Sequence, residues 1–300
     1  MTANPLLLMN EEPDEPGPLV ELKTRLVLYT DRSPGPATAR RVYDVYMARF
    51  EAGITGYRST AFGSEVNEWT PSARKHFEMV ELPNLRRQEH WGYVFGSEQL
   101  TDGHLFMFHG AKPATQAGWA SVFRFDFEWN FDPETLRQFT LEVLQAVECV
   151  WGTAGYVLCP DEEAEPARAN DQVYAWAMRY WGAQAQDLDV TMQLALTGLE
   201  CLSWLTVIGP VLRERTPNVL TRARAIGFSA FEAGRHVIIQ AEERPRLIDR
   251  NRRETLGNYP TLAEALLPLQ VKEHLGFSGD LWDEYNTMRY IHRFTNPNDV

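Results

Sequence analysis

The sequence predicts an α+β protein with antiparallel sheet and with helices packed on one side. Strand-like segments cluster along the chain instead of alternating with long helices, which argues against a doubly wound parallel sheet. Residues 120–131 alternate aromatic and polar side chains, as an antiparallel strand with one buried face does. Residues 225–241 have the pattern of a β-hairpin that turns through residues 232–235.

The first half of the chain begins with a segment that favours flexibility. Residues 1–18 combine prolines with like charges that cannot pack, so we expect a flexible leader. A strand follows at residues 19–29, where apolar side chains alternate with basic ones. The next expected elements are two helices and three strands, at residues 37–52, 70–82, 91–97, 103–110 and 120–131.

The strand at residues 120–131 has two chemically different faces. Phe123, Phe125 and Phe127 fall on one face, and Asp126 and Glu128 fall on the other. We predict that the aromatic face is buried and that the carboxylate face is exposed to solvent.

The second half opens with a well-marked helix start, because Asp132 is a capping residue and Pro133 suits the first turn. The later elements are expected at residues 155–158, 172–181, 225–231, 236–241, 261–269 and 279–294, with a further short helix beginning at Pro210. We expect residues 19–300 to form a single domain. A subdivision near residues 155–170, into two related halves, stays open.

The negative charge of the chain is concentrated in one stretch. The formal net charge is −12, and residues 125–200 hold 14 acidic and only 3 basic side chains. Such a field repels nucleic acid and anionic lipid and attracts a basic partner. A solvated acidic surface that favours solubility is the alternative interpretation. The carboxylates that we select as candidate partner-binding residues are Asp126, Glu128, Asp161, Glu162, Glu163, Glu165, Asp187 and Asp189.

The sequence contains no recognisable catalytic or metal-binding motif. Its seven histidines form no zinc-binding pattern, and it has neither a nucleophile elbow nor a glycine-rich phosphate-binding loop. We therefore predict no catalytic residue, no metal and no cofactor. The arginines within residues 244–253 alternate with acidic residues, which indicates a salt-bridged surface segment.

The three cysteines and the N-terminus bear on localisation. An odd cysteine count without paired spacing is typical of buried thiols in a reducing compartment, although a bridge between Cys149 and Cys159 stays open. The N-terminus lacks the pattern of a secretory signal, and no apolar run is long enough to span a membrane. A cytoplasmic protein is the default expectation.

Two motifs in the last third of the chain carry a family resemblance. Residues 201–212 read CLSWLTVIGPVL, and residues 239–245 read IQAEERP. Together with Asp249, Asn251 and Arg252, they resemble the type VI immunity family of bacterial proteins, formerly classed as a domain of unknown function. The residues that we take as the fold signature are Trp204, Gly209, Pro210, Gln240, Arg244 and Pro245.

The resemblance covers residues 19–294 and is strongest from Trp204 onward. It implies an immunity protein that binds and neutralises a cognate antibacterial toxin from a contact-dependent secretion system. A nuclease-type toxin is our first expectation, since such toxins often accompany the family, and a basic nuclease would suit the acidic stretch. The resulting hypothesis is that exposed carboxylates occlude the active site of the toxin.

Two other classes of function stay open beside this hypothesis. One is an enzyme of unrecognised type with a carboxylate-lined pocket, and the other is a non-catalytic structural or adaptor protein. We expect neither nucleic acid nor a membrane as a partner. A homodimer stays open.

Overall fold

The computed structural model describes residues 4–9, 18–31, 33–60, 65–87, 91–97, 103–110, 118–160 and 166–297. The strands within these residues are β1 (Leu7–Met9), β2 (Pro18–Thr30), β3 (Gly56–Ser59), β4 (Asn67–Glu68), β5 (Gly92–Gly96), β6 (Leu105–His109), β7 (Ser121–Glu128), β8 (Trp151–Pro160), β9 (Leu205–Ile208), β10 (Ser229–Ala233) and β11 (His236–Gln240). The α-helices are α1 (Pro36–Phe50), α2 (Pro71–His76), α3 (Pro133–Ala146), α4 (Pro166–Arg179), α5 (Leu188–Leu194), α6 (Pro210–Arg215), α7 (Val219–Ala225), α8 (Tyr259–Leu266) and α9 (Glu284–Ile291).

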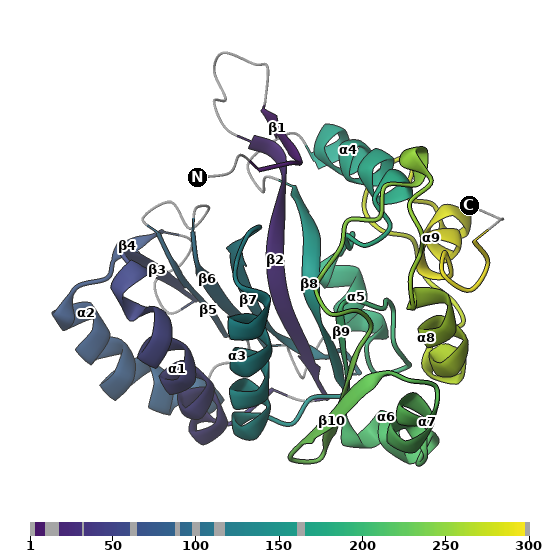
Figure 1. The fold of residues 1–300 in the computed structure, drawn as a ribbon. Helices are drawn as coiled ribbons and strands as arrows, with labels where there is room; N and C mark the ends of the chain where they lie inside the picture. The colour runs from purple at the N-terminus through teal and green to yellow at the C-terminus, as the bar shows by residue number, and fades with distance from the viewer. Residues whose placement is uncertain are drawn as a thin grey trace.

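All of the described strands belong to one open antiparallel sheet (Figure 1). Their order is β10-β11-β9-β8-β2-β7-β6-β5-β3-β4, and β1 pairs with β2. The predicted α+β class with antiparallel strands is therefore confirmed. Strands from both sides of residues 155–170 lie in this one sheet.

The long strand β2 lies at the centre and is buried on both faces. It pairs with β7 along one edge and with β8 along the other, so that Leu26 lies between Phe125 and Ala154. Leu26 and Leu28 belong to one hydrophobic core, and the alternate residues Val27 and Tyr29 belong to another. The sheet therefore separates two cores.

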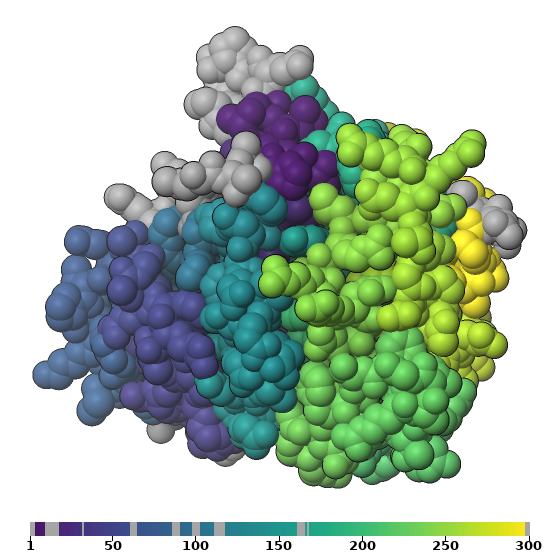
Figure 2. Space-filling view, viewed as in Figure 1, coloured from purple at the N-terminus to yellow at the C-terminus, as the bar shows by residue number. Residues whose placement is uncertain are grey.

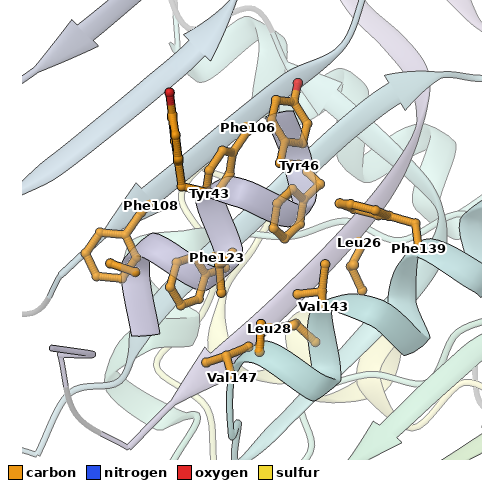
Figure 3. Packing of buried hydrophobic residues seen from close by; sticks show 14 of the residues in the cluster. Leu26, Leu28, Tyr43, Tyr46, Phe106, Phe108, Phe123, Phe139, Val143 and Val147 are labelled. Carbon is orange, nitrogen blue, oxygen red and sulfur yellow. The ribbon is translucent and has the colours of Figure 1, made fainter. Parts of the chain in front are cut away.

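The first core lies beneath α1 and α3 and is rich in aromatic side chains. Tyr46 of α1 sits 4.9 Å from the ring of Phe106 and 5.8 Å from that of Phe125. Phe139 of α3 meets Phe125 edge-on at 5.1 Å. Figure 3 shows Phe139 beside Leu26. Tilted and edge-on ring pairs stabilise this layer beyond the area that they bury.

The second core covers the opposite face, where α5, α6, α7 and α8 pack (Figure 1). Its members include Met192, Ile208, Leu212 and Leu262. The helices therefore lie on both faces of the sheet, where the sequence had suggested one side. Periodicity within a helix shows that one face is apolar, but it does not show which face of the sheet that surface covers.

The prediction for the polar face of residues 120–131 is wrong for most of the strand. Val122 and Asp126 are both fully buried, and Glu128 at the end of β7 is exposed. The second layer covers this face, so β7 is buried on both sides. The alternation of the sequence marks two faces of different polarity, but not two faces of different exposure.

Several boundaries differ from the predicted ones. Residues 7–9 of the expected leader form β1, while residues 10–17 lie outside the described residues. The helix capped by Asp132 ends at Ala146, and β8, which was expected only at residues 155–158, takes up residues 151–160. The strand β9 and the helices α5 and α7 were not predicted as such, because each has seven residues or fewer and little periodicity.

Two further predictions concerned a disulfide bridge and membrane-spanning segments. Cys149, Cys159 and Cys201 are all buried free thiols, so the bridge that was left open does not form in this structure. No helix among the described residues is both long and apolar enough to cross a membrane.

Three of the signature residues, Trp204, Gly209 and Gln240, make internal contacts in the second half of the fold. The indole Nε1 of Trp204 donates to the carbonyl of Glu242 at 2.8 Å, and Gln240 Nε2 donates to the same carbonyl at 2.9 Å. Gly209 lies against the backbone of residues 149–150, where a Cβ would overlap the carbonyl oxygen of Cys149. The signature therefore reflects hydrogen bonding and close backbone packing.

Gly209→Ala should destabilise the protein, because the added methyl group would overlap backbone atoms of residues 149–150, and moving that backbone costs free energy. We expect a loss of about 2–3 kcal/mol in the free energy of unfolding, measured by urea titration. The matched control is Gly53→Ala, since a Cβ at Gly53 meets no atom within 4 Å. Equal stability of the two variants would show that the contact at Gly209 does not restrict the residue.

Candidate functional site

A buried ion pair joins the two central strands on the second face of the sheet. Arg25 of β2 faces Asp126 of β7 directly, with Nε to Oδ1 at 2.6 Å and Nη2 to Oδ2 at 2.9 Å. Arg124 adds a third contact, from its Nε to Oδ2 of Asp126 at 2.8 Å. This bidentate geometry is the strongest arrangement of an arginine with a carboxylate.

The ion pair overturns the proposed role of Asp126 as a partner-binding residue. Burial opposes the charged form, but the charges and hydrogen bonds of Arg124 and Arg25 hold the pKa of Asp126 well below its ordinary value. The carboxylate is thus ionised, buried and fully engaged inside the protein. The arginine across the sheet is 101 residues away in sequence, which is why local patterning could not reveal it.

Arg25 also connects the sheet to the segment that follows α4. Its Nη1 donates to Gln186 Oε1 at 3.1 Å, and Gln186 Nε2 donates to Gln184 Oε1 at 2.8 Å. These contacts place the backbone of residues 184–186 over the ion pair, directly before Asp187 and the start of α5.

A partly open cavity of about 450 Å³ lies beside this ion pair. Its walls carry side chains of both charges, including Arg58 of β3, Arg124 of β7, His109 of β6, Asp187 and Asp189. Apolar and polar residues of α4 and of the chain at 277–282 complete it. The cavity thus has a mixed lining, where the sequence had suggested a uniformly acidic surface.

Two of the predicted partner-binding carboxylates meet at this cavity. Asp187 is half-buried and caps α5, accepting from the Val190 backbone N–H at 3.2 Å. It also accepts from the backbone N–H and the hydroxyl of Ser278, at 2.9 and 2.6 Å. Asp189 is exposed on the same wall. Asp187 therefore fixes the start of α5 to the chain at Ser278, and Asp189 is exposed to solvent.

The structure describes one of the remaining predicted carboxylates. Glu128 is exposed at the end of β7. Asp161, Glu162, Glu163 and Glu165 lie outside the described residues, although Pro160, which directly precedes them, lines the cavity.

Ion pairs with distant arginines neutralise part of the acidic stretch. Glu134 pairs with Arg137, but Glu142 and Glu148 pair with Arg49 and Arg235 from outside residues 125–200. The field around this stretch is consequently weaker than its net charge indicates.

A surface that the sequence analysis missed adjoins the cavity. Phe277, Ser278 and Trp282 line the cavity wall, and the chain around them exposes Leu281 and Tyr285. The sequence predicted only a helix for this segment. Its one local signal was the dense run of apolar and acidic residues at positions 280–285, which read DLWDEY.

A buried histidine anchors the start of this missed segment. The Gly276 N–H donates to His274 Nδ1 at 3.0 Å, so the ring proton lies on Nε2, which donates to Glu200 Oε2 at 3.2 Å. Thr191 of α5 donates to the other oxygen of Glu200 at 3.0 Å. Burial raises the pKa of Glu200, and the hydrogen bond from His274 offsets part of this rise. The segment is thereby fixed to α5.

A second cavity, of about 560 Å³, lies where α3 meets the β10–β11 hairpin, on the side of the molecule shown in Figure 2. The signature residues Trp204, Gln240 and Arg244 line it together with Asp132 and Phe231. Within the described ranges, no three His, Cys, Asp or Glu side chains are arranged to hold a metal ion.

Comparison with protein families decides the identity of the chain. A family model described as type VI immunity for VRR-NUC matches residues 41–294. The chain belongs to this type VI immunity family. The resemblance found in the signature motifs is thereby confirmed.

Comparison with solved structures supports the fold of this immunity protein. The Pseudomonas aeruginosa T6SS protein PA0821 is similar with a TM-score of 0.74 and 17% identity, over 98% of this chain and 86% of that one. At this identity the likeness shows a shared fold. A search of curated proteins found no match.

Asp126→Asn should destabilise the immunity protein by about 3–5 kcal/mol at pH 7, because two arginines lose a buried partner. The folded-state pKa of Asp126 is lowered, so its contribution is present above the ordinary carboxyl pKa of 3.8 and is lost as the pH falls below it. The difference in unfolding free energy between Asp126→Asn and wild type, measured by urea titration, should therefore be smaller at pH 3 than at pH 7.

The control for this variant is Glu128→Gln, which removes an exposed charge from the same strand. We expect its free energy of unfolding to stay within about 0.5 kcal/mol of the wild-type value. If the difference in unfolding free energy between Asp126→Asn and wild type became larger at low pH, the role given to the ion pair would be contradicted.

Proposed function

We propose that this protein neutralises a VRR-NUC toxin by binding it and covering its active site, without catalysing a reaction itself. The observation that carries the proposal is the match of residues 41–294 to the family described as type VI immunity for VRR-NUC. The abbreviation NUC denotes a nuclease, in agreement with the toxin class expected from the sequence.

Electrostatics supports a direct complex. A nuclease must hold a phosphate backbone, so its active-site cleft carries cationic groups. The immunity protein has a net charge of −12, and Glu128 and Asp189 remain exposed after the internal ion pairs are formed. Carboxylates placed on such a cleft occupy the positions of substrate phosphates.

Charge complementarity also favours fast association. Opposite fields on two proteins steer their encounter and raise the association rate, most strongly at low salt. An immunity protein must capture its toxin before the toxin reaches nucleic acid, so a high association rate serves this function.

The site of action that we propose is the cytoplasm, where the nucleic-acid substrates of a nuclease lie. The three buried free thiols are compatible with that reducing compartment.

The test of occlusion is a competition experiment with a purified VRR-NUC nuclease, the partner class that the family description names. The immunity protein should inhibit DNA cleavage at a 1:1 ratio. With the divalent metal removed to prevent cleavage, added duplex DNA should raise the apparent Kd of the complex in proportion to its concentration. Inhibition without competition would exclude occlusion of the active site.

The test of electrostatic steering uses charge reversals. Glu128→Lys combined with Asp189→Lys, two exposed carboxylates, should slow association with the toxin about tenfold at low salt, measured by stopped flow. The matched control is Glu214→Lys with Glu264→Lys, two exposed carboxylates on α6 and α8. An association rate that is independent of salt, together with equal effects of both pairs, would rule out steering by this surface.

A further inference from the structure

We propose that the toxin docks on an aromatic and acidic surface at the C-terminal end of the chain. This docking surface consists of Leu275, Asp280, Leu281, Asp283, Glu284 and Tyr285. The proposal rests on the proposed function and deepens it, because it names the anchor residues and the chemistry of the partner surface.

The docking surface exposes large apolar side chains close together in sequence. Leu275, Leu281 and Tyr285 are 62%, 43% and 68% exposed. Single exposed hydrophobic residues are normal, but three within eleven residues, in a segment that also lines a cavity through Phe277 and Trp282, are typical of an interaction site. Tyrosine in particular is enriched among the residues that dominate binding energy.

The backbone beneath these side chains is held firmly. Trp282 is buried between Phe277 and Tyr290, at ring distances of 5.0 and 5.3 Å, and its Nε1 donates to the carbonyl of Asn170 in α4. His274 and Ser278 tie the same segment to Glu200 and Asp187. A surface that is already ordered loses little entropy on binding.

The charges within the docking surface itself are acidic, and the nearest cation along the chain that contacts it is Arg289. Between Lys272 and Arg289 the chain has four carboxylates and neither Lys nor Arg. Asp280, Asp283 and Glu284 are exposed around Leu281. The contact of Ser278 with Asp187 places this surface beside the start of α5, where Asp189 is exposed.

The occupant that fits this surface is the cationic face of a nuclease. Lysine and arginine side chains can lay their methylene stems on Tyr285 and Leu281 while their charged ends meet the surrounding carboxylates. The guanidinium of Arg289 lies over the Tyr285 ring, 5.4 Å from its centroid, so this ring already accepts a cation within the chain.

A second copy of this chain fits less well. A two-fold symmetric dimer through this surface would set Asp280, Asp283 and Glu284 opposite the same carboxylates of the other copy. Like charges in that arrangement repel each other, and the surface offers few cations to offset them.

The test is Leu281→Ala combined with Tyr285→Ala in the full chain. Both side chains are substantially exposed, so the melting temperature should stay near that of wild type. We expect the Kd for the VRR-NUC nuclease that the wild-type chain inhibits to rise about 100-fold, measured by calorimetry. The matched control is Val211→Ala with Ile226→Ala, which truncates two side chains that are 41% and 48% exposed elsewhere, and should leave the Kd within about twofold.

Three outcomes would overturn the proposal in different ways. If the double variant binds like wild type while the wild-type chain inhibits the toxin, the docking surface lies elsewhere and the proposed function stands. If the wild-type chain neither binds nor inhibits this toxin, the proposed function fails as well. If light scattering shows a wild-type dimer that the double variant abolishes, the surface serves self-association.

Discussion

The buried ion pair between Arg25 and Asp126 is the interaction on which the arrangement of this protein depends. It joins the two central strands, β2 and β7, where the second layer covers the sheet. Burying charges costs free energy, which the bidentate geometry and the third contact from Arg124 offset. Because Arg25 also binds Gln186, the same group positions the segment that leads to α5 and the cavity.

The signature motifs and the proposed docking surface have different physical roles. Trp204, Gly209 and Gln240 make internal hydrogen bonds or close backbone contacts, so few other residues fit there. Tyr285 and Leu281 make few such demands on the fold because they are largely exposed. The residues that identify the family are therefore different from those that we propose bind the toxin.

The distribution of charge decides how an acidic immunity protein can act. A carboxylate that is paired internally contributes little to the field that a partner meets, whereas an exposed one contributes fully. In this chain Asp126 belongs to the first kind, and Asp189 and Glu284 belong to the second. Steering and docking thus depend on a subset of the acidic residues, drawn from both the acidic stretch and the C-terminal segment.

The α+β class, the strands at β2 and β7, the capped helix after Asp132 and the family could all be predicted from the amino-acid sequence, because they follow from local periodicity, capping chemistry and motif spacing. Only the tertiary structure decided that both faces of the sheet are covered, that Asp126 is buried, and that residues 275–285 adjoin Asp187. The physical reason is that burial and electrostatic fields depend on distances between residues that are remote in sequence, whereas composition and periodicity report only on neighbours along the chain.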